Sequence, residues 1–190
     1  AAMLTSSGQA ANFYAVFNIA NCGDHVVASS TIYGGTYNLF ANTLAESGIE
    51  TTFVDGSDPD NFAKAIRENT KLLYVESLDN PNSNVADIEA LAEVAHAHGI
   101  PLIVDNTFAS PYLFRPLEHG ADVVVHSATK FIGGHGTAMG GVIVDGGKFD
   151  WTQNDKFPGI SQPNPNCHGA VLADICGPAA YITKIRITLL

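Results

Sequence analysis

The chain has 190 residues, of which 46% are hydrophobic and 15% charged, and its formal net charge is −10. A chain of this length and composition can bury one domain-sized core, which excludes an intrinsically disordered protein. The nine Lys and Arg residues are scattered along the sequence. Nucleic acids and anionic membranes are therefore not expected as partners, because both require clustered positive charge.

The cysteines and the chain ends support further expectations. Three cysteines are an odd number without metal-type spacing, which argues against a disulfide framework and favours a reducing cytoplasm. No apolar run approaches the length of a membrane span. The chain begins abruptly and stops inside the apolar run Ile187-Thr-Leu-Leu190, so we expect it to be a segment of a longer protein.

The first half of the chain alternates helical and strand patterns. Apolar residues three or four apart predict a helix over residues 8–21, starting near Ser7. A second helix is predicted from the turn Tyr33-Gly-Gly-Thr36 to about residue 46. A third is predicted over residues 59–67, with Asp58 as its N-cap. Short apolar runs between the helices predict strands over residues 25–30, 50–54 and 72–76.

The second half continues this alternation as far as Trp151. A loop over residues 80–84 precedes an amphipathic helix at 88–98, which Gly99 ends. Strands are predicted at residues 101–105, 123–125 and 141–145, an extended loop at 157–166, and a further helix near Ala170. Apolar strands that alternate with helices predict an α/β fold around a mostly parallel sheet.

Ligands of such a sheet bind outside the carboxyl ends of its strands. The polar residues of greatest interest all fall at strand ends or helix starts: Ser7, Gly8, Gln9, Tyr33, Glu76, Asn80, Asp105, Thr107, Ser127, Thr129 and Lys130. Their common position predicts one binding site at that edge of the sheet.

Lys130 requires a chemical explanation, because it follows the apolar strand at residues 123–125. A lysine there loses hydration unless its charge is paired or removed. We predict that Lys130 forms a Schiff base with pyridoxal phosphate. Asp105, at the end of the preceding strand, would pair with the protonated ring nitrogen of this cofactor.

The remaining polar residues fit the same cofactor. Gly8 and Gln9 open a helix, whose free N–H groups and dipole attract an anion such as phosphate. The hydroxyl groups of Ser127 and Thr129 would add donors to that phosphate. Tyr33, beside two glycines, would lay its ring on a flat heteroaromatic ligand.

Purely structural interpretations of these residues remain open. Ser7 and Gly8 are also an ordinary helix start, Asp105 a cap of the following turn, and Tyr33 a surface tyrosine. His126, within a strand, is predicted to be a hydrogen-bonded core histidine.

Metal and competing motif interpretations are weaker. His96 and His98 are two apart on a helix and point to different sides, so no metal site is predicted. Ser127-Ala-Thr-Lys130 fits the Ser-x-x-Lys pattern of penicillin-recognising enzymes, but their Ser-Asp-Asn and Lys-Thr-Gly segments do not occur here. Residues 133–141 are glycine-rich but lack the ending of a phosphate loop.

The sequence resembles the Cys/Met-metabolism family of pyridoxal-phosphate enzymes. The signature is Val104-Asp-Asn-Thr-Phe108, then Val125-His-Ser-Ala-Thr-Lys130 and Gly133-Gly-His135. The resemblance implies the aspartate-aminotransferase-like fold, a three-layer αβα sandwich. It implies the same roles for the residues above, adds proton transfer by Tyr33, and places Asn80 near the phenolic oxygen of the cofactor. Thr107 is also expected to bind the cofactor.

The resemblance also implies a reaction. Residues 33–40 and 156–158 are similar to those of family members that act on O-acetylhomoserine. In this γ-replacement the substrate amine displaces Lys130, which then removes the α-proton. Acetate leaves, and sulfide or methanethiol takes its place to give homocysteine or methionine. Cystathionine γ-synthase activity, methionine γ-lyase activity and a truncated non-catalytic chain remain alternatives.

Two departures from the family pattern concern the chain ends. Family members normally carry an amino-terminal segment that reaches the phosphate of the neighbouring subunit, and a carboxy-terminal domain that holds the substrate carboxylate. The resemblance therefore implies that residues 1–190 are the large, cofactor-binding domain, without these parts, of a homo-oligomer arranged as a dimer of dimers. Cys167 stands where relatives often have tyrosine.

Overall fold

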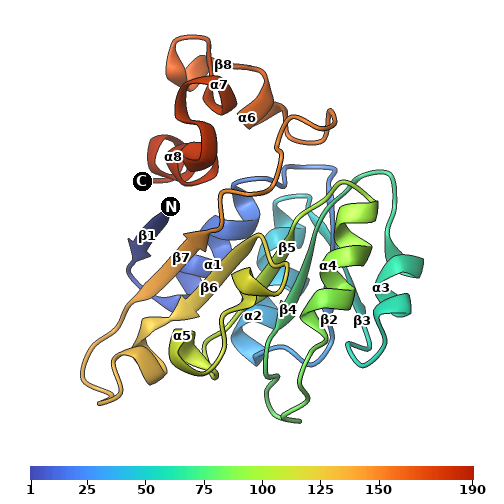
Figure 1. Cartoon of the computed structure of the whole chain (residues 1–190), viewed down its shortest axis with the longest axis vertical. Coiled ribbons are helices and arrows are strands. Elements are labelled where there is room, and N and C mark those ends of the chain that lie inside the picture. Colours follow the sequence, from blue (N-terminus) through green and yellow to red (C-terminus); the bar gives the residue numbers. More distant parts are fainter.

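The structure is a computed structural model that describes all 190 residues, and it is organised around one seven-stranded sheet (Figure 1). The strand order is β1-β7-β6-β5-β4-β2-β3. All neighbouring pairs from β3 to β6 are parallel, whereas β7 runs antiparallel to both β6 and β1. The strands are β1 (Ala2–Thr5), β2 (His25–Ser29), β3 (Glu50–Val54), β4 (Thr70–Glu76), β5 (Leu102–Asp105), β6 (Val123–Ser127) and β7 (Gly141–Asp145).

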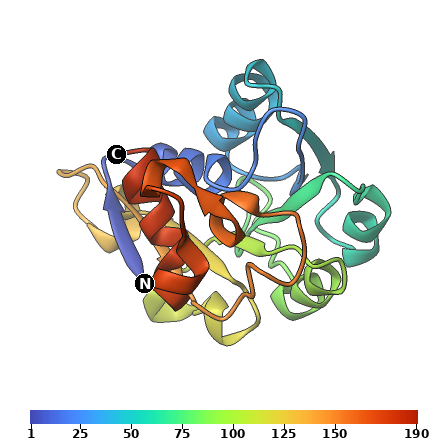
Figure 2. The same ribbon diagram turned by 90° about the horizontal axis from the view of Figure 1, so that it is seen from above.

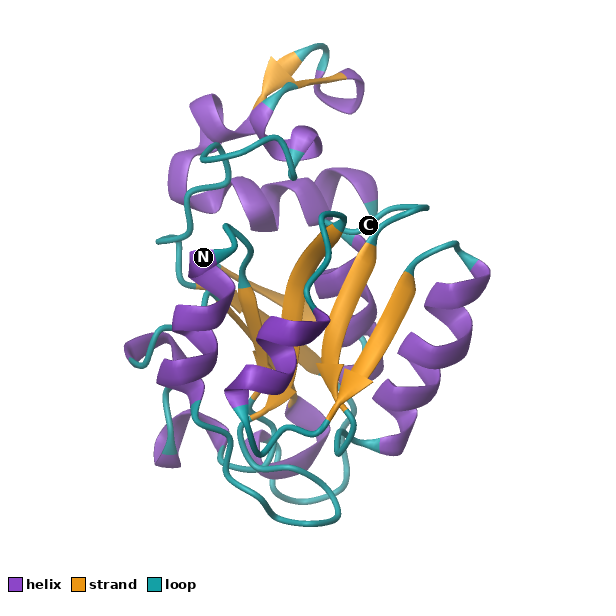
Figure 3. Ribbon diagram, turned by 90° about the vertical axis from the view of Figure 1, so that its right-hand side faces the viewer, coloured by secondary structure: helices purple, strands orange, loops and turns teal.

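Helices cover both faces of this sheet, which gives the three layers visible in Figure 3. The helix α1 (Gly8–Phe17) lies on one face with α2 (Gly34–Asn38), which continues into the π-helical segment η1 (Leu39–Leu44). The other face carries α3 (Pro59–Ala65) and α4 (Ile88–Ala97). Because both faces are covered, central strands such as β2 and β5 are buried at every residue.

Local chemistry explains where these helices begin. Ser7 accepts a hydrogen bond from the Ala10 amide at 3.0 Å, and Asp58 accepts one from the Asp60 amide at 2.9 Å. The predicted α/β fold and the order of its main elements are confirmed. The first helix is shorter than predicted and ends at Phe17. The edge strand β1 was not predicted, because four residues of mixed burial give no clear pattern.

Residues beyond β7 form a separate group of short elements at the amino-terminal end of the parallel strands. They are α6 (Pro158–Ser161), β8 (Pro163–Asn164), β9 (Ala170–Val171), α7 (Leu172–Cys176) and α8 (Ala180–Thr188). Figure 2 looks down on them and shows α8 lying across this end of the sheet. The loop predicted at residues 157–166 is therefore wrong in part, since it contains α6 and β8.

An aromatic cluster attaches this group to the rest of the fold. The Trp151 ring stacks on the Tyr181 ring at 5.1 Å between centroids and meets Phe149 and Phe157 edge-on. The Tyr181 hydroxyl donates a hydrogen bond to the Ala15 carbonyl of α1 at 2.7 Å. These contacts fix the position of α8 against α1. None of the helices has both the length and the apolar character that crossing a membrane would require.

The junction of β1, β7 and the start of α1 requires a glycine. A Cβ atom on Gly141 would lie 2.1 Å from the Ser7 carbonyl oxygen and 2.3 Å from the Thr5 hydroxyl oxygen. We therefore expect Gly141→Ala to lower the free energy of unfolding by about 1–3 kcal/mol, measured by urea titration. Gly140→Ala is the matched control, because its Cβ would meet only ordinary contacts at 3.6 Å or more. Equal loss in both variants would contradict this account.

Candidate active site at the carboxyl edge of the sheet

The carboxyl ends of the parallel strands meet at the lower edge of the molecule in Figure 1. There β4 ends at Glu76, β5 at Asp105 and β6 at Ser127. The first residue of α1, Gly8, lies against the end of β6. A Cβ atom on Gly8 would be 2.5 Å from the Ser127 Cβ and 2.9 Å from its hydroxyl oxygen. Two residues predicted to hold one anion are therefore in direct contact.

Free hydrogen-bond donors surround this contact. The amides of Gly8 and Gln9 belong to the first turn of a ten-residue helix, so no carbonyl group within the helix accepts from them. The Ser127 hydroxyl forms no hydrogen bond with the rest of the chain. The Gln9 side chain donates to the Gly35 carbonyl at 3.0 Å, which connects the start of α1 to the start of α2. This arrangement suits an anion such as phosphate.

Thr129 differs from the prediction that its hydroxyl group faces the anion. Its hydroxyl donates to the Gly140 carbonyl at 3.2 Å and accepts from the Gly140 amide at 3.0 Å. A hydroxyl group has one hydrogen to donate, and here the Gly140 carbonyl receives it. In this arrangement Thr129 holds the glycine-rich segment before β7 against the end of β6.

Asp105 is a buried carboxylate with several donors and no cationic partner. One oxygen accepts from the Thr107 amide at 2.9 Å and the Thr107 hydroxyl at 2.5 Å. The Asn12 amide lies 3.4 Å from the other oxygen. Asp105 forms no ion pair with any basic side chain. Burial raises the pKa of Asp105 above its ordinary value, and the bonds from Thr107 and Asn12 oppose this rise only in part. A cationic ring nitrogen is the kind of partner that such a carboxylate fits.

A hydrogen-bonded network next to Asp105 includes Asn12 and Tyr74, which the sequence did not lead us to predict as site residues. The buried Tyr74 hydroxyl donates to the Asn12 side-chain oxygen at 2.9 Å, and the Asn12 amide donates to the Thr36 hydroxyl at 3.1 Å. One available signal was a polar residue, Asn12, one turn after Gly8 within an otherwise apolar stretch. The other was Tyr74, two residues before Glu76 and so on the same face of β4.

Tyr33 stands at the start of α2 and is 52% exposed. Its amide donates to a Glu76 carboxylate oxygen at 2.7 Å. Its ring lies over Gly35, where a Cβ atom would be 2.5 Å from the ring. The predicted turn glycine therefore leaves room for the ring. Asn80 lies in the loop after β4, and its side chain forms no hydrogen bond with the other predicted site residues.

Lys130 lies in the π-helical segment η3 (Ala128–Ile132), three residues after Ser127. Its own backbone angles, φ −87° and ψ −113°, are not helical. The expectation that this lysine loses its hydration is wrong, because its side chain is exposed. Its ammonium group forms no ion pair or hydrogen bond with the chain, so no other residue competes with a ligand for it. His126, by contrast, is buried and bonds to the Asn106 carbonyl at 3.1 Å, as predicted.

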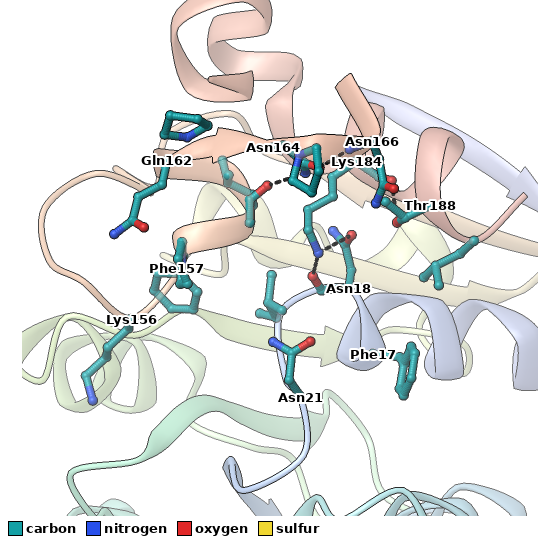
Figure 4. Close-up of a pocket in the computed structure, with 17 residues that line it drawn as sticks. Phe17, Asn18, Asn21, Lys156, Phe157, Gln162, Asn164, Asn166, Lys184 and Thr188 are labelled. Atoms are coloured by element: carbon teal, nitrogen blue, oxygen red, sulfur yellow. Dashed lines mark hydrogen bonds between the residues drawn. The ribbon is translucent and has the colours of Figure 1, made fainter. Parts of the chain in front are cut away.

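A cavity of about 520 Å³ lies at the opposite end of the molecule, between α1, α6 and α8 (Figure 4). Its lining includes Lys184, whose ammonium group donates to the Asn18 carbonyl, and Lys156. Burial lowers the pKa of Lys184 to about 8. No carboxylate lines this cavity, and none of the predicted site residues does. We place the candidate site at the carboxyl edge, where the anion donors, Asp105 and Lys130 occur together.

Known proteins share both this sequence and this fold. The chain is 56% identical over 188 residues to homocysteine synthase of Schizosaccharomyces pombe, and 48% identical over 195 residues to O-acetyl-L-homoserine sulfhydrylase of Leptospira meyeri. Each match covers 98% of this chain and 44% of the relative, so the chain spans less than half the length of these relatives.

A solved structure agrees with the sequence relatives. The chain superimposes with a TM-score of 0.93 and 41% identity on a protein of Campylobacter jejuni described as an O-acetylhomoserine (thiol)-lyase. This match covers 99% of the present chain and 47% of that one, which carries N′-pyridoxyl-lysine-5′-monophosphate. A profile of the family described as Cys/Met metabolism PLP-dependent enzyme matches residues 1–175. The chain therefore belongs to the Cys/Met-metabolism family of enzymes that depend on pyridoxal phosphate.

Proposed function

We propose that this chain carries the cofactor site of an enzyme that replaces the γ-substituent of O-acetyl-L-homoserine by sulfide or methanethiol. The products would be homocysteine or methionine, together with acetate. The observation that carries the proposal is the carboxyl edge itself: a cation-free buried Asp105, the anion donors at Gly8 and Ser127, and the free amine of Lys130. The names of the relatives favour this reaction over the cystathionine γ-synthase and methionine γ-lyase alternatives.

The residues present fit the cofactor. When bound, pyridoxal phosphate supplies an aldehyde that links to amines and a ring that withdraws electrons from the substrate. The amides of Gly8 and Gln9 and the Ser127 hydroxyl would hold its phosphate. The Asp105 carboxylate would hold the protonated ring nitrogen, and Thr107 would keep that carboxylate in place through its two hydrogen bonds.

Lys130 would act twice through the same atom. Its Nζ would first bind the cofactor covalently and then, once displaced by the substrate amine, take the α-proton of the substrate. The exposure of Lys130 and its lack of any partner in the chain leave its side chain accessible to a ligand. Tyr33 would place its ring on the cofactor and assist the proton transfer, and Asn80 would lie beside the phenolic oxygen. Thr129 would support the site indirectly, through the two hydrogen bonds between its hydroxyl group and the Gly140 backbone.

The setting of this site is also part of the proposal. We infer that residues 1–190 form the cofactor-binding domain of an enzyme that works in the cytoplasm as a homo-oligomer. Three unpaired cysteines suit a reducing compartment. Large apolar side chains are exposed at the carboxyl edge, among them Tyr112, Leu113, Phe131 and Met139. Covering such side chains is what association of copies would achieve.

Product analysis tests the proposed reaction. Purified protein loaded with pyridoxal phosphate and given O-acetylhomoserine and sulfide should form homocysteine and acetate. Lys130→Ala should reduce this rate by more than about a thousandfold, since the residue supplies both the covalent link and the base. Formation of ammonia and an oxo acid alone would show a lyase and refute the sulfhydrylase proposal.

The contact between α1 and β6 predicts a separate effect on cofactor affinity. Gly8→Ala should raise the dissociation constant for pyridoxal phosphate by about tenfold or more, because its Cβ would displace Ser127. Absorbance titration of the cofactor-free protein measures this constant. Gly34→Ala, at the first position of α2 where a Cβ meets nothing within 4 Å, is the matched control. An unaltered affinity of Gly8→Ala for pyridoxal phosphate would show that the start of α1 does not bind the phosphate.

A further inference from the structure

Two carboxyl groups lie side by side at the centre of the candidate site. Glu76 and Asp105 are register partners at the carboxyl ends of the neighbouring parallel strands β4 and β5. Register partners on parallel strands point to the same face of a sheet, which here is the face covered by α1 and α2. Each residue is only 8% exposed.

No cation compensates this pair. Neither carboxyl group forms an ion pair with a basic side chain. The titratable groups that face the pair come from β4, β6, the loop after β4 and the start of α2: Tyr74, His126, Asp79 and Tyr33. Of these only His126 can become positive, and burial lowers its pKa. Two neighbouring buried carboxylates without a cation disfavour each other's ionisation, so one of them retains a proton.

The hydrogen bonds favour Glu76 as the carboxyl group that retains it. Asp105 accepts two bonds from Thr107 and one from Asn12, whereas Glu76 accepts a single bond from the Tyr33 amide. The Ser127 amide donates to the Thr107 hydroxyl oxygen at 2.8 Å, which leaves the hydroxyl hydrogen for Asp105. More donors stabilise the anion of Asp105. Burial raises the pKa of both carboxyl groups, but the bonds from Thr107 and Asn12 oppose this rise at Asp105, whereas the charge of Asp105 adds to it at Glu76, whose pKa reaches about 8.

We propose that Glu76 is a positioning residue that carries the one proton of this pair, so that Asp105 keeps its negative charge. A carboxyl oxygen of Glu76 also accepts the hydrogen bond from the Tyr33 amide and so fixes the turn at Tyr33. The protonation claim does not depend on the proposed function. Only the purpose of the proton does, namely to keep an ionised Asp105 for the ring nitrogen and a fixed Tyr33 for the ring of the cofactor. The cofactor-free protein is therefore the first in which the proton is sought.

Infrared spectroscopy of the cofactor-free protein detects the proton directly. The wild type should show the C=O band of a neutral carboxylic acid near pH 6.5 and lose it as the pH rises through about 8. Glu76→Gln should remove the band. Asp105→Asn should keep it but shift its loss to lower pH, because the neighbouring charge is gone. Asp145→Asn, which alters a buried carboxyl group on β7 at the opposite end of the sheet, should leave the transition near pH 8.

The outcomes separate the two possible proton carriers. A band that survives Glu76→Gln and disappears in Asp105→Asn would place the proton on Asp105 and overturn the proposal. The absence of any such band in the wild type near pH 6.5 would do the same. If Glu76→Gln fails to fold, the shift seen in Asp105→Asn still decides between the two carboxyl groups.

Stability gives an independent measurement with a defined sign. The pKa of Glu76 is higher in the folded chain than its ordinary value of 4.5. Between about pH 5 and 8 the folded state therefore binds more protons than the unfolded state, and wild-type stability should fall as the pH rises. In Glu76→Gln this part of the fall should vanish. Parallel pH profiles for the two proteins would contradict a proton on Glu76.

The positioning role has its own readout. Glu76→Leu removes the acceptor for the Tyr33 amide and should raise the dissociation constant for pyridoxal phosphate by roughly tenfold. Glu76→Gln keeps an acceptor oxygen and should recover most of this loss. Equal losses of cofactor affinity in both variants would show that the hydrogen bond from the Tyr33 amide to Glu76 does not position Tyr33. Failure of the wild type to bind the cofactor would instead refute the proposed function, without affecting the infrared result.

Discussion

A buried carboxylate without a cation determines how the carboxyl edge of this sheet is built. Leaving Asp105 charged in the interior costs free energy, which hydrogen bonds from Thr107 and Asn12 offset. Thr107 provides two of these donors, and its hydroxyl oxygen also accepts from the Ser127 amide, so the ends of β5 and β6 are tied together. Asn12 extends the same network to α1. The site is thus preorganised for a cationic group by bonds that the fold itself requires.

Close backbone approach gives this edge its second property. Because Gly8 has no side chain, the start of α1 lies directly against Ser127, and its free amides come together with a free hydroxyl group. Ser127, at the end of β6, belongs to this anion-binding corner, and its amide also donates to the Thr107 hydroxyl group that binds Asp105. Lys130 follows on the next turn of the chain, with an unpaired amine. A ligand with both a phosphate group and a protonated ring nitrogen would match these two groups.

Much of this was predictable from the sequence, and the failures have physical causes. The buried parallel strands are continuous apolar runs, so their positions and the α/β fold followed from pattern alone. Gly8, Asp105 and Ser127 were predictable because strand ends and helix starts are defined locally. The exposure of Lys130 and the capture of the Thr129 hydroxyl by Gly140 were not, since both depend on how the glycine-rich segment folds back.

The covalent bond at Lys130 is the most direct test of the account. The protein is loaded with pyridoxal phosphate, reduced with borohydride, digested, and its peptides are mapped by mass spectrometry. A phosphopyridoxyl group is expected on the peptide that contains Lys130, in about one copy per chain. Modification confined to Lys184 or Lys156, which line the cavity at the other end of the molecule, would contradict it.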